Sequence, residues 1–298
     1  MKKITNDELL DIISESTLKN NGSLWLNNIE TNQNQFGFKN TVKDIEIKKN
    51  KTLVIAAGPE SKKIFSNEFS KIEHFRKDIS IVACDGALST LSKNNCIPDI
   101  IVSVDGAQII SKFYKENKEI LNGKTVILST SIHPDVVKIC IDNGANIKWV
   151  QSFFNNKSHA KFFRSGIPSI KMGGNVGTAS FLISSLVLRS NPIGLMGIEF
   201  AWSDETPYSS TQYFEKLKKS LDDKIDSVKK HYVHVKNFRD NKTYIADPVY
   251  YCYYLMLKEI WDELPLSIKQ NTYNLTKAGI LNLAGLKNIS VEEYMVKY

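Results

Sequence analysis

The sequence has 298 residues, of which 42% are hydrophobic and 24% are charged, the proportions of an ordinary soluble globular protein. Its formal net charge of +7 comes mostly from lysines scattered among acidic residues, which favours anionic partners such as phosphates and argues against a nucleic-acid-binding groove. No apolar run reaches the roughly 18 residues that a membrane span needs, so we expect no transmembrane segment.

The cysteines and the first residues bear on the cellular compartment. Cys84, Cys96, Cys140 and Cys252 lie far apart and form no C-x-x-C pair, which is typical of reduced, buried cysteines in a reducing compartment. The stretch MKKITNDELLDII becomes acidic where a secretory signal peptide would become apolar. We therefore expect a cytoplasmic protein.

Residues 1–50 form a flanking segment ahead of the regular pattern. Amphipathic spacing predicts a helix from Asn6 to Thr17. A polar stretch rich in Asn and Gln, LWLNNIETNQNQFGFKN, follows this helix. The pattern leaves open whether the flank is a docking arm or folds back onto the rest of the chain.

Residues 51–205 have the pattern of a doubly wound α/β domain. Short, continuous apolar runs alternate with helix-length segments, as in strands that are covered on both faces of a parallel sheet. Right-handed crossovers then predict a mostly parallel, Rossmann-like sheet. The predicted strands are TLVIAA (52–57), ISIVAC (79–84), IIVSV (100–104), TVILS (125–129), IKWVQ (147–151) and IGLMGIEF (193–200).

Residues 206–298 differ in character and predict a helical cap, or lid, that packs on this core. A charged helix is expected over residues 211–230, followed by HYVHV and the polar turn FRDNKTY. A second helix is expected over residues 247–264, with Asp247 as its amino-terminal cap and Pro248 in its first turn.

Open parallel sheets bind ligands at the carboxyl ends of their strands, so the residues that follow each strand are candidates. Gly58-Pro59-Glu60-Ser61 follows the first strand and suits an anion through its backbone N–H groups, although it is also a common plain turn. Asp85 and Asp105 follow the second and third strands. Each could hold a ribose, a base edge or Mg²⁺, or could cap the helix after it.

The fourth strand ends in Ser129, with Thr130, Ser131 and His133 close behind it. The hydroxyl groups there could bind a phosphate or a base, and His133 could transfer a proton. The alternative interpretation is that His133 merely caps the next helix.

Three glycines within five residues mark Gly173-Gly174-Asn175-Val176-Gly177-Thr178, which precedes an apolar helix candidate. Small residues allow the backbone to approach a ligand closely, Asn175 or Thr178 could bond to it, and the helix terminus would stabilise a phosphate. A purely structural glycine cluster is the alternative. Glu199 lies on the next predicted strand, where its carboxylate would face the same edge.

The ordered motifs AAGPES, VACDGAL, IPDIIVSVD, GGNVGTASFLI and IGLMGIEFAW resemble the MptE-like family, which joins archaeal 6-hydroxymethyl-7,8-dihydropterin diphosphokinases with the Maf flagellin glycosyltransferases. The resemblance covers roughly residues 25–285. Asp99 and Asp105 match the I-P-D…D pair of the family. Glu60 stands where the family usually has the serine of Gly-Pro-Ser, and Glu199 replaces the aspartate of a Gly-x-Asp strand end.

The two branches of the family imply different reactions. Diphosphokinases of this type tend to carry Gly-Gly-Phe-Thr-Asp-Gly-Asp where this chain has GGNVGTAS, so acids that would help to hold Mg-ATP are missing. The Maf branch, and the bacterial sialyltransferases that it resembles in fold, use a Gly-Asn-Val-Gly or Ser-Gly type of loop. The resemblance therefore implies a nucleotide-dependent transferase, best a Maf-like glycosyltransferase that uses a CMP-activated nonulosonic sugar and no metal cofactor.

The glycosyltransferase interpretation gives roles to three groups of residues. Asp85 and Asp105 would hold the ribose or base, Glu199 would orient the donor or the acceptor, and His231, or failing that His133, would be the general base. The donor-binding residues are expected to be Gly58, Pro59, Ser61, Ser129, Gly173, Gly174, Asn175, Gly177, Thr178 and, by analogy with sialyltransferase lids, Tyr208. The acceptor, a protein hydroxyl or a glycan, is not visible in the sequence.

Two other functions stay open. In a pterin diphosphokinase, Asp85 and Asp105, with Glu199, would hold Mg²⁺ against ATP while a pyrophosphoryl group moves to a hydroxymethyl oxygen. A nucleotide-binding module without catalytic activity is the third interpretation, and Glu60 in the first loop is the feature that favours it.

Overall fold

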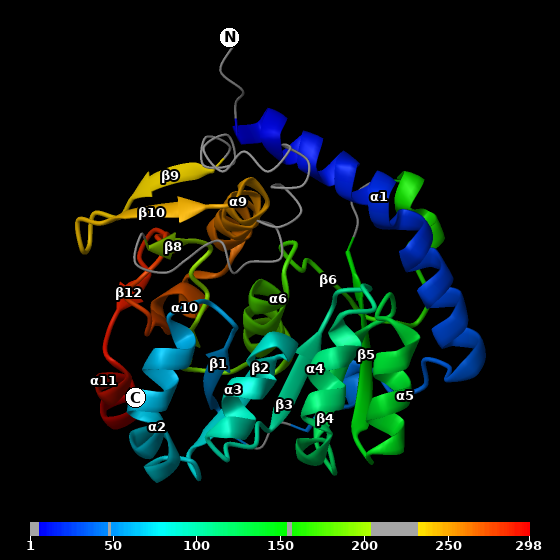
Figure 1. Cartoon of the computed structure of the whole chain (residues 1–298), viewed down its shortest axis with the longest axis horizontal. Helices are drawn as coiled ribbons and strands as arrows, with labels where there is room; N and C mark the ends of the chain where they lie inside the picture. The colour runs from blue at the N-terminus through cyan, green and yellow to red at the C-terminus, as the bar shows by residue number, and fades with distance from the viewer. Residues whose placement is uncertain (1–5, 47–48, 154–156, 204–231) are drawn as a thin grey trace.

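A computed structural model describes residues 6–46, 49–153, 157–203 and 232–298 (Figure 1). Within these residues a nine-stranded sheet has the order β12-β11-β7-β1-β2-β3-β4-β5-β6, and its pairings are parallel. Its strands are β1 (Lys51–Ile55), β2 (Ile79–Cys84), β3 (Ile100–Ser103), β4 (Thr125–Ser129), β5 (Asn146–Ser152), β6 (Ser169–Ile170), β7 (Ile193–Met196), β11 (Thr272–Asn274) and β12 (Lys287–Asn288). The predicted doubly wound α/β fold is confirmed.

The six strands predicted from apolar runs are all present. β1, β3 and β7 are buried along their whole length, as expected for strands in the middle of an α/β sheet. β7 ends earlier than predicted, at Met196, because Gly197 adopts a φ of +81° and turns the chain out of the sheet.

Helices pack on both faces of the sheet, and loops follow its strands at the carboxyl edge. Adjacent members of the series α2, α3, α4 and α5 contact one another as a layer, and α6 packs across β1, β2 and β3. Because the chain returns from β6 to β7, right-handed crossovers place α6 on the opposite face. The bounds are α2 (Ser61–His74), α3 (Leu88–Lys93), α4 (Ile110–Glu116), α5 (Pro134–Asp142) and α6 (Val176–Leu182), which continues as a π-helix over Ile183–Val187.

The direction in which strands are added reverses between β1 and β7. The chain proceeds from β1 outward to β6 on one side, and then from β7 to β11 and β12 on the other. This reversal is the topological switch point, at which open α/β sheets bind ligands beyond the carboxyl ends of the strands. It lies between the loop that contains Gly58 and the turn that begins at Gly197.

The amino-terminal helix is longer than predicted. α1 (Asn6–Gln35) continues through the Asn- and Gln-rich stretch that follows Thr17, and it runs over the carboxyl edge of the sheet (Figure 1). Asn and Gln in this stretch suggested a polar loop, since asparagine has a low intrinsic helix propensity. Asn28 and Asn32, one turn apart, instead donate hydrogen bonds to the loops after β3 and β4, so tertiary contacts determine the helix length.

The carboxy-terminal part is only partly helical. α9 (Pro248–Glu263) matches the predicted second helix, and the Asp247 side chain caps it by accepting the N–H of Val249 at 2.8 Å. β9 (Val233–Lys236) and β10 (Thr243–Ala246) pair antiparallel with each other, and β10 pairs with β8 (Trp202–Ser203). β11 and β12 extend the main sheet, and α10 (Leu266–Gln270) and α11 (Val291–Lys297) complete the segment. The predicted helix over 211–230 lies outside the described residues.

Two further expectations concern the whole chain. The four cysteines are free and buried, as expected of small apolar side chains. Among the described residues, no helix is long and apolar enough to cross a membrane.

Candidate functional site at the carboxyl edge of the sheet

The structure brings the residues after five strands together along one edge. β7, β1, β2, β3 and β4 are consecutive neighbours in the parallel sheet, so their carboxyl ends lie side by side. Glu199, Gly58, Asp85 and Asp105 follow the first four of these strands in that order, and Ser129 is the last residue of β4. Burial and bonding differ sharply among the five, and these differences decide which of them can reach a ligand.

Glu199 points inward, to the loop between β1 and α2. Its carboxylate accepts the backbone N–H of Glu60, which is 3.2 Å from Oε1 and 3.1 Å from Oε2, and only 1% of the residue is exposed. This carboxylate therefore occupies the amino terminus of α2, where we expected a donor phosphate. Ser61 is also buried, and its hydroxyl donates to the Gly58 carbonyl at 2.6 Å.

Two glycines, Gly58 and Gly279, lie against Glu199. A Cβ atom on Gly58 would lie 2.7 Å from Glu199 Oε1, and one on Gly279 would lie 2.7 Å from the Glu199 Cβ. Gly197 has similar contacts with Ala56 and Ser61 across the switch point. Burial in this space raises the pKa of Glu199 to about 8, and the hydrogen bond from Glu60 opposes the shift without cancelling it.

Asp85 is also directed into the protein. The hydroxyl of Ser103, on the neighbouring strand, donates to its Oδ2, and the N–H of Gly86 donates to its Oδ1 at 2.7 Å. Burial raises the pKa of Asp85 to about 6. The expectation that Asp85 binds a ribose or base therefore does not fit this conformation, in which both of its oxygens already have protein donors.

Asp105 differs from both of these acids because its side chain is exposed. Its Oδ1 accepts the N–H of Ala107 at 3.0 Å, which fixes the carboxylate in the loop after β3. The charge of Asp105 contributes to the raised pKa of Asp85, so the two acids lie near each other. Of the predicted carboxylates, Asp105 is the one that is placed to meet a ligand.

The loop after β4 is largely bonded within itself. Ser129 is buried, and its hydroxyl lies 3.0 Å from that of Ser131. His133 is the N-cap of α5, and its Nδ1 accepts the N–H of Asp135 at 3.2 Å. The capping interpretation of His133 therefore describes its contact, and one ring nitrogen is not available as a general base.

The glycine-rich loop before α6 is built for close packing. Gly173 and Gly174 have φ values of +59° and +77°, which other residues rarely adopt. Asn175 caps α6 by accepting the N–H of Thr178 at 2.9 Å, and it donates to the hydroxyl of Thr178 at 2.9 Å. Both side chains are thus bonded to each other, and Gly177 is buried close to Ala56. The exposed part of the loop is the turn at Gly174.

Two helices that the sequence did not assign to the site lie over this edge. From α9, the ring of Tyr253 and the Met256 sulfur lie against one side of Gly174, within 3.1 Å of where a Cβ atom would stand. From α1, Trp25 and Asn28 lie against Gly106 in the same way. The run YYCYY (250–254) was the available signal for α9, and the four-residue spacing of Asn28 and Asn32 was the signal for α1.

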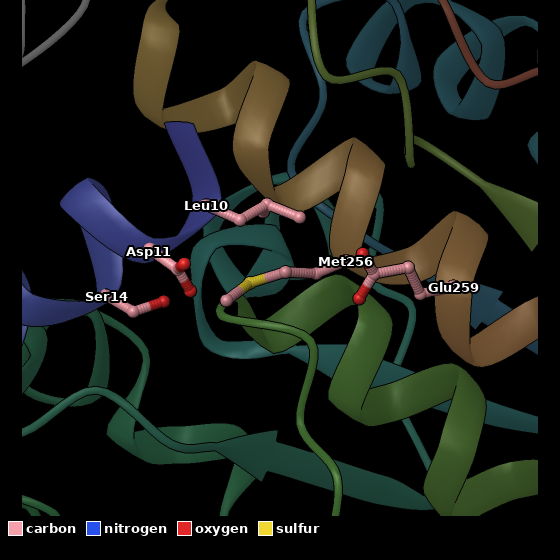
Figure 2. A pocket seen from close by; sticks show the side chains of 5 residues that line it. All are labelled: Leu10, Asp11, Ser14, Met256 and Glu259. Carbon is pink, nitrogen blue, oxygen red and sulfur yellow. The ribbon is translucent and has the colours of Figure 1, made fainter. Parts of the chain in front are cut away.

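A cavity of about 260 Å³ lies between α1 and α9 (Figure 2). Leu10, Asp11 and Ser14 line it from α1, and Met256 and Glu259 line it from α9. Met256 points across the cavity toward α1 (Figure 2). Its sulfur also lies against Gly174. The cavity therefore lies beside the glycine-rich loop.

Some predicted residues are elsewhere. His231 and Tyr208 lie outside the described residues. Asp99 is at the opposite, amino edge of the sheet, where it accepts the N–H of Ile81 at 2.8 Å. In the parts of the chain that the structure describes, no three His, Cys, Asp or Glu residues form a cluster that could hold a metal ion.

The sheet order, the switch point and the loops at its carboxyl edge define a doubly wound α/β protein whose candidate site is built by strand-end loops. The chain belongs to the MptE-like family, because the family model "6-hydroxymethylpterin diphosphokinase MptE-like" matches residues 23–205. The family resemblance stated from the motifs is confirmed.

A solved structure has a similar fold. The Maf glycosyltransferase from Magnetospirillum magneticum AMB-1 superimposes with a TM-score of 0.57 at 13% sequence identity, over 83% of this chain and 34% of that protein. The chain thus spans about a third of that protein's length. No curated protein sequence matches the chain.

Proposed function

We propose that the protein is a nucleotide-dependent transferase that moves a sugar from a CMP-activated nonulosonic acid to an acceptor hydroxyl. The observation that carries the proposal is that five strand-end loops share the carboxyl edge of the sheet and two of them flank its switch point, the place where folds of this kind bind ligands. Membership of the MptE-like family and the fold shared with a protein described as a glycosyltransferase support a transferase.

In this proposal the donor phosphate lies against the turn before α6. The amino terminus of α2 is the alternative position, but there the Glu199 carboxylate already accepts the N–H of Glu60. At α6, the Asn175 cap accepts the N–H of Thr178 and not those of Val176 and Gly177. When a CMP-sugar loses its sugar, negative charge grows on the leaving phosphate. Amide N–H groups and the positive end of a helix stabilise such a charge without a metal ion.

Asp105 and Tyr253 have the remaining donor contacts in this proposal. The exposed carboxylate of Asp105 accepts hydrogen bonds from the hydroxyl groups of the ribose. The ring of Tyr253, which lies against Gly174, forms one wall beside the donor. The helices α1 and α9 exclude water, which would otherwise hydrolyse the activated sugar. His231 remains the proposed general base that takes the proton from the acceptor hydroxyl.

Thermal-shift measurements on the full chain test the proposal, because a ligand that binds the native state raises the melting temperature with its occupancy. We expect CMP to raise it without magnesium, and we expect Asp105→Asn to remove most of the shift. Asp142→Asn, which changes an exposed acid of α5, is the matched control and should keep the shift. A shift that requires ATP and Mg²⁺, with none for CMP, overturns the proposal.

The second candidate is a pterin diphosphokinase, which the name of the matched family model and the closeness of Asp85 and Asp105 favour. Asp105 offers an exposed oxygen ligand of the kind that Mg²⁺ prefers, whereas both oxygens of Asp85 have protein donors. Asp105 therefore fits an ion that the phosphates of ATP hold in large part. ATP-Mg²⁺ and 6-hydroxymethylpterin in the same thermal-shift series distinguish this function. A nucleotide shift without turnover on any acceptor would favour the binding module.

A further inference from the structure

A second concave surface lies at the opposite edge of the sheet from the candidate site. This cleft has a volume of about 500 Å³ and lies at the amino ends of β1, β2, β3 and β4. Four of its side chains are cationic and two are acidic. The lining residues are Lys49, Glu73, Arg76, Lys77, Asn95, Ile97, Asp99 and Lys124.

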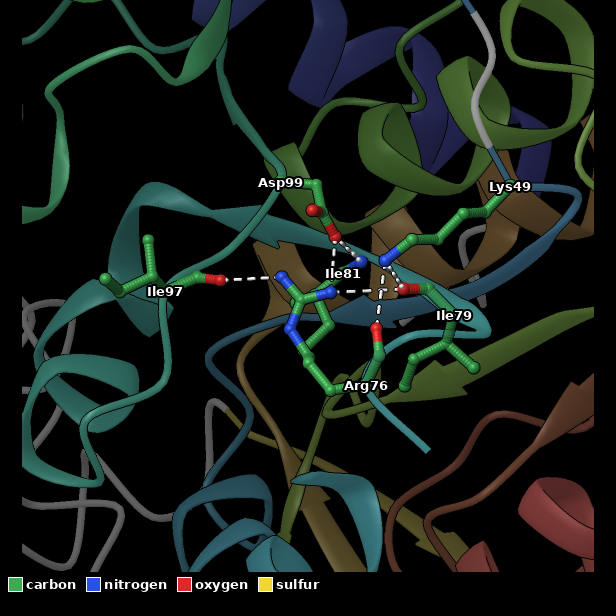
Figure 3. A network of polar contacts seen from close by, with 6 residues as sticks. All are labelled: Lys49, Arg76, Ile79, Ile81, Ile97 and Asp99. Carbon is green, nitrogen blue, oxygen red and sulfur yellow. Dashed lines mark hydrogen bonds and ion pairs between the residues drawn. The ribbon is translucent and has the colours of Figure 1, made fainter. Parts of the chain in front are cut away.

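Two of the cations are held close together. Lys49 Nζ and Arg76 Nη1 donate to the same carbonyl oxygen, that of Ile79, at 2.9 and 3.1 Å (Figure 3). The carboxylate of Asp99 compensates the charge of the Arg76 guanidinium, with 2.8 Å between Oδ2 and Nη1. The Lys49 ammonium donates to two backbone carbonyl oxygens, those of Arg76 and Ile79, each at 2.9 Å. Two like charges that share one carbonyl acceptor repel each other, and an anion in the cleft would relieve the repulsion.

The rim adds two more cations. Lys77 is exposed and Lys124 is partly exposed, and neither forms an ion pair within the described ranges. Glu73 is the remaining acid of the lining. The cleft therefore carries an excess of positive charge on a concave surface, which focuses the electrostatic field toward its centre.

The base of the cleft is fixed before any ligand arrives. Asp99 accepts the N–H of Ile81 at 2.8 Å as well as the guanidinium, and Arg76 Nη2 donates to the carbonyl of Ile97 at 2.8 Å (Figure 3). These bonds tie the end of α2 to the loop before β3. Cations that are already ordered lose little side-chain entropy on binding, which favours affinity.

We propose that this cleft binds a small molecule that carries a phosphate or diphosphate group. Guanidinium and ammonium groups together are the usual protein partners of phosphate oxygens. The volume exceeds that of a single phosphate and falls within the range of small-molecule sites. The site is independent of the proposed transferase reaction, because it lies at the other end of the strands.

The test is calorimetric titration of the full chain with sodium pyrophosphate at low ionic strength. We expect Lys77→Glu with Lys124→Glu to weaken binding by about tenfold or more, because each reversed charge replaces an attraction with a repulsion. The control, Lys115→Glu with Lys258→Glu, makes the same change in net charge at exposed lysines outside the cleft and should bind as the wild type does. Lys77→Gln with Lys124→Gln should give an intermediate affinity.

Failure of this proposal can be distinguished from failure of the proposed transferase function. Equal pyrophosphate affinities in the cleft variant and the control, or no binding by the wild type, would overturn the proposal. Melting temperatures of the variants verify that they fold. The thermal shift with CMP reports on the opposite edge, and the cleft variant should retain whatever shift the wild type has.

Discussion

Replacement of Glu199 by glutamine tests whether burial or capping controls this carboxyl. The two backbone contacts and the amino terminus of α2 favour the ionised form by at most about 2 kcal/mol, whereas burial disfavours it. Since one pKa unit corresponds to about 1.36 kcal/mol, a rise from 4.5 to about 8 means that ionised Glu199 costs the native state about 5 kcal/mol. Glu199→Gln keeps the shape and an acceptor for Glu60 while removing the charge.

The sign of the pH dependence follows from the raised pKa. Below about pH 4.5 both folded and unfolded chains hold the proton, so Glu199 imposes no penalty. Between that pH and about 8 the unfolded chain binds fewer protons than the native state, and the wild type loses stability relative to Glu199→Gln as the pH rises.

Urea unfolding at pH 5, 7 and 9 measures this difference. We expect the free energy of unfolding of Glu199→Gln to exceed that of the wild type by an amount that grows by several kcal/mol from pH 5 to 9. Glu15→Gln, at an exposed position of α1, should show no such trend. A difference that stays constant with pH, or that changes in favour of the wild type, would mean that the carboxyl is an ionised helix cap and would refute the reasoning.

Four other changes probe the site. Gly174→Ala should destabilise the fold by about 1–3 kcal/mol in urea unfolding, because its φ is +77° and the new Cβ atom would collide with Tyr253; unchanged stability would mean that α9 does not press on this turn. Asn32→Ala should cost about 1–3 kcal/mol in the same assay, because the carbonyls of Thr130 and Ile132 lose their donor. Asp105→Asn should weaken CMP binding about tenfold with little change in stability, as calorimetry would show; equal affinity would remove Asp105 from the site. His231→Ala should lower kcat of sugar transfer by about 10²–10⁴-fold with a small change in KM, and an undiminished kcat would exclude it as the base.

The sheet could be predicted from the sequence because most of its long strands carry a run of apolar residues. The short strands could not be predicted in this way. β11 spans Thr272–Asn274 and β12 spans Lys287–Asn288, lengths at which periodicity has no statistical weight. They form because β7 offers an edge to pair with, and such a partner is visible only in three dimensions. The full length of α1 was missed for a related reason, since its asparagines bond to loops about a hundred residues away.

The sequence predicted that the loops of the candidate site share one edge of the sheet, but it did not predict the directions of their side chains. The parallel order of the strands brings these loops to one edge, but the rule that ligands meet the carboxyl ends of strands says nothing about rotamers. Asp85 turns toward Ser103, and Asn175 turns toward Thr178. Each orientation depends on a hydroxyl that lies on another strand or one helical turn away.

These inward orientations share a physical cause. Where a strand ends and a helix begins, backbone N–H groups lose their carbonyl acceptors. A nearby polar side chain can then accept their hydrogen bonds inside the protein. Glu199, Asp85 and Asn175 all accept such N–H groups, whereas Asp105 accepts one and still exposes its carboxylate. A polar residue after a strand is therefore evidence of a ligand only when its side chain remains exposed after the local amides are satisfied. By this criterion the exposed Asp105, and not the buried Glu199, supports the proposed position of the donor.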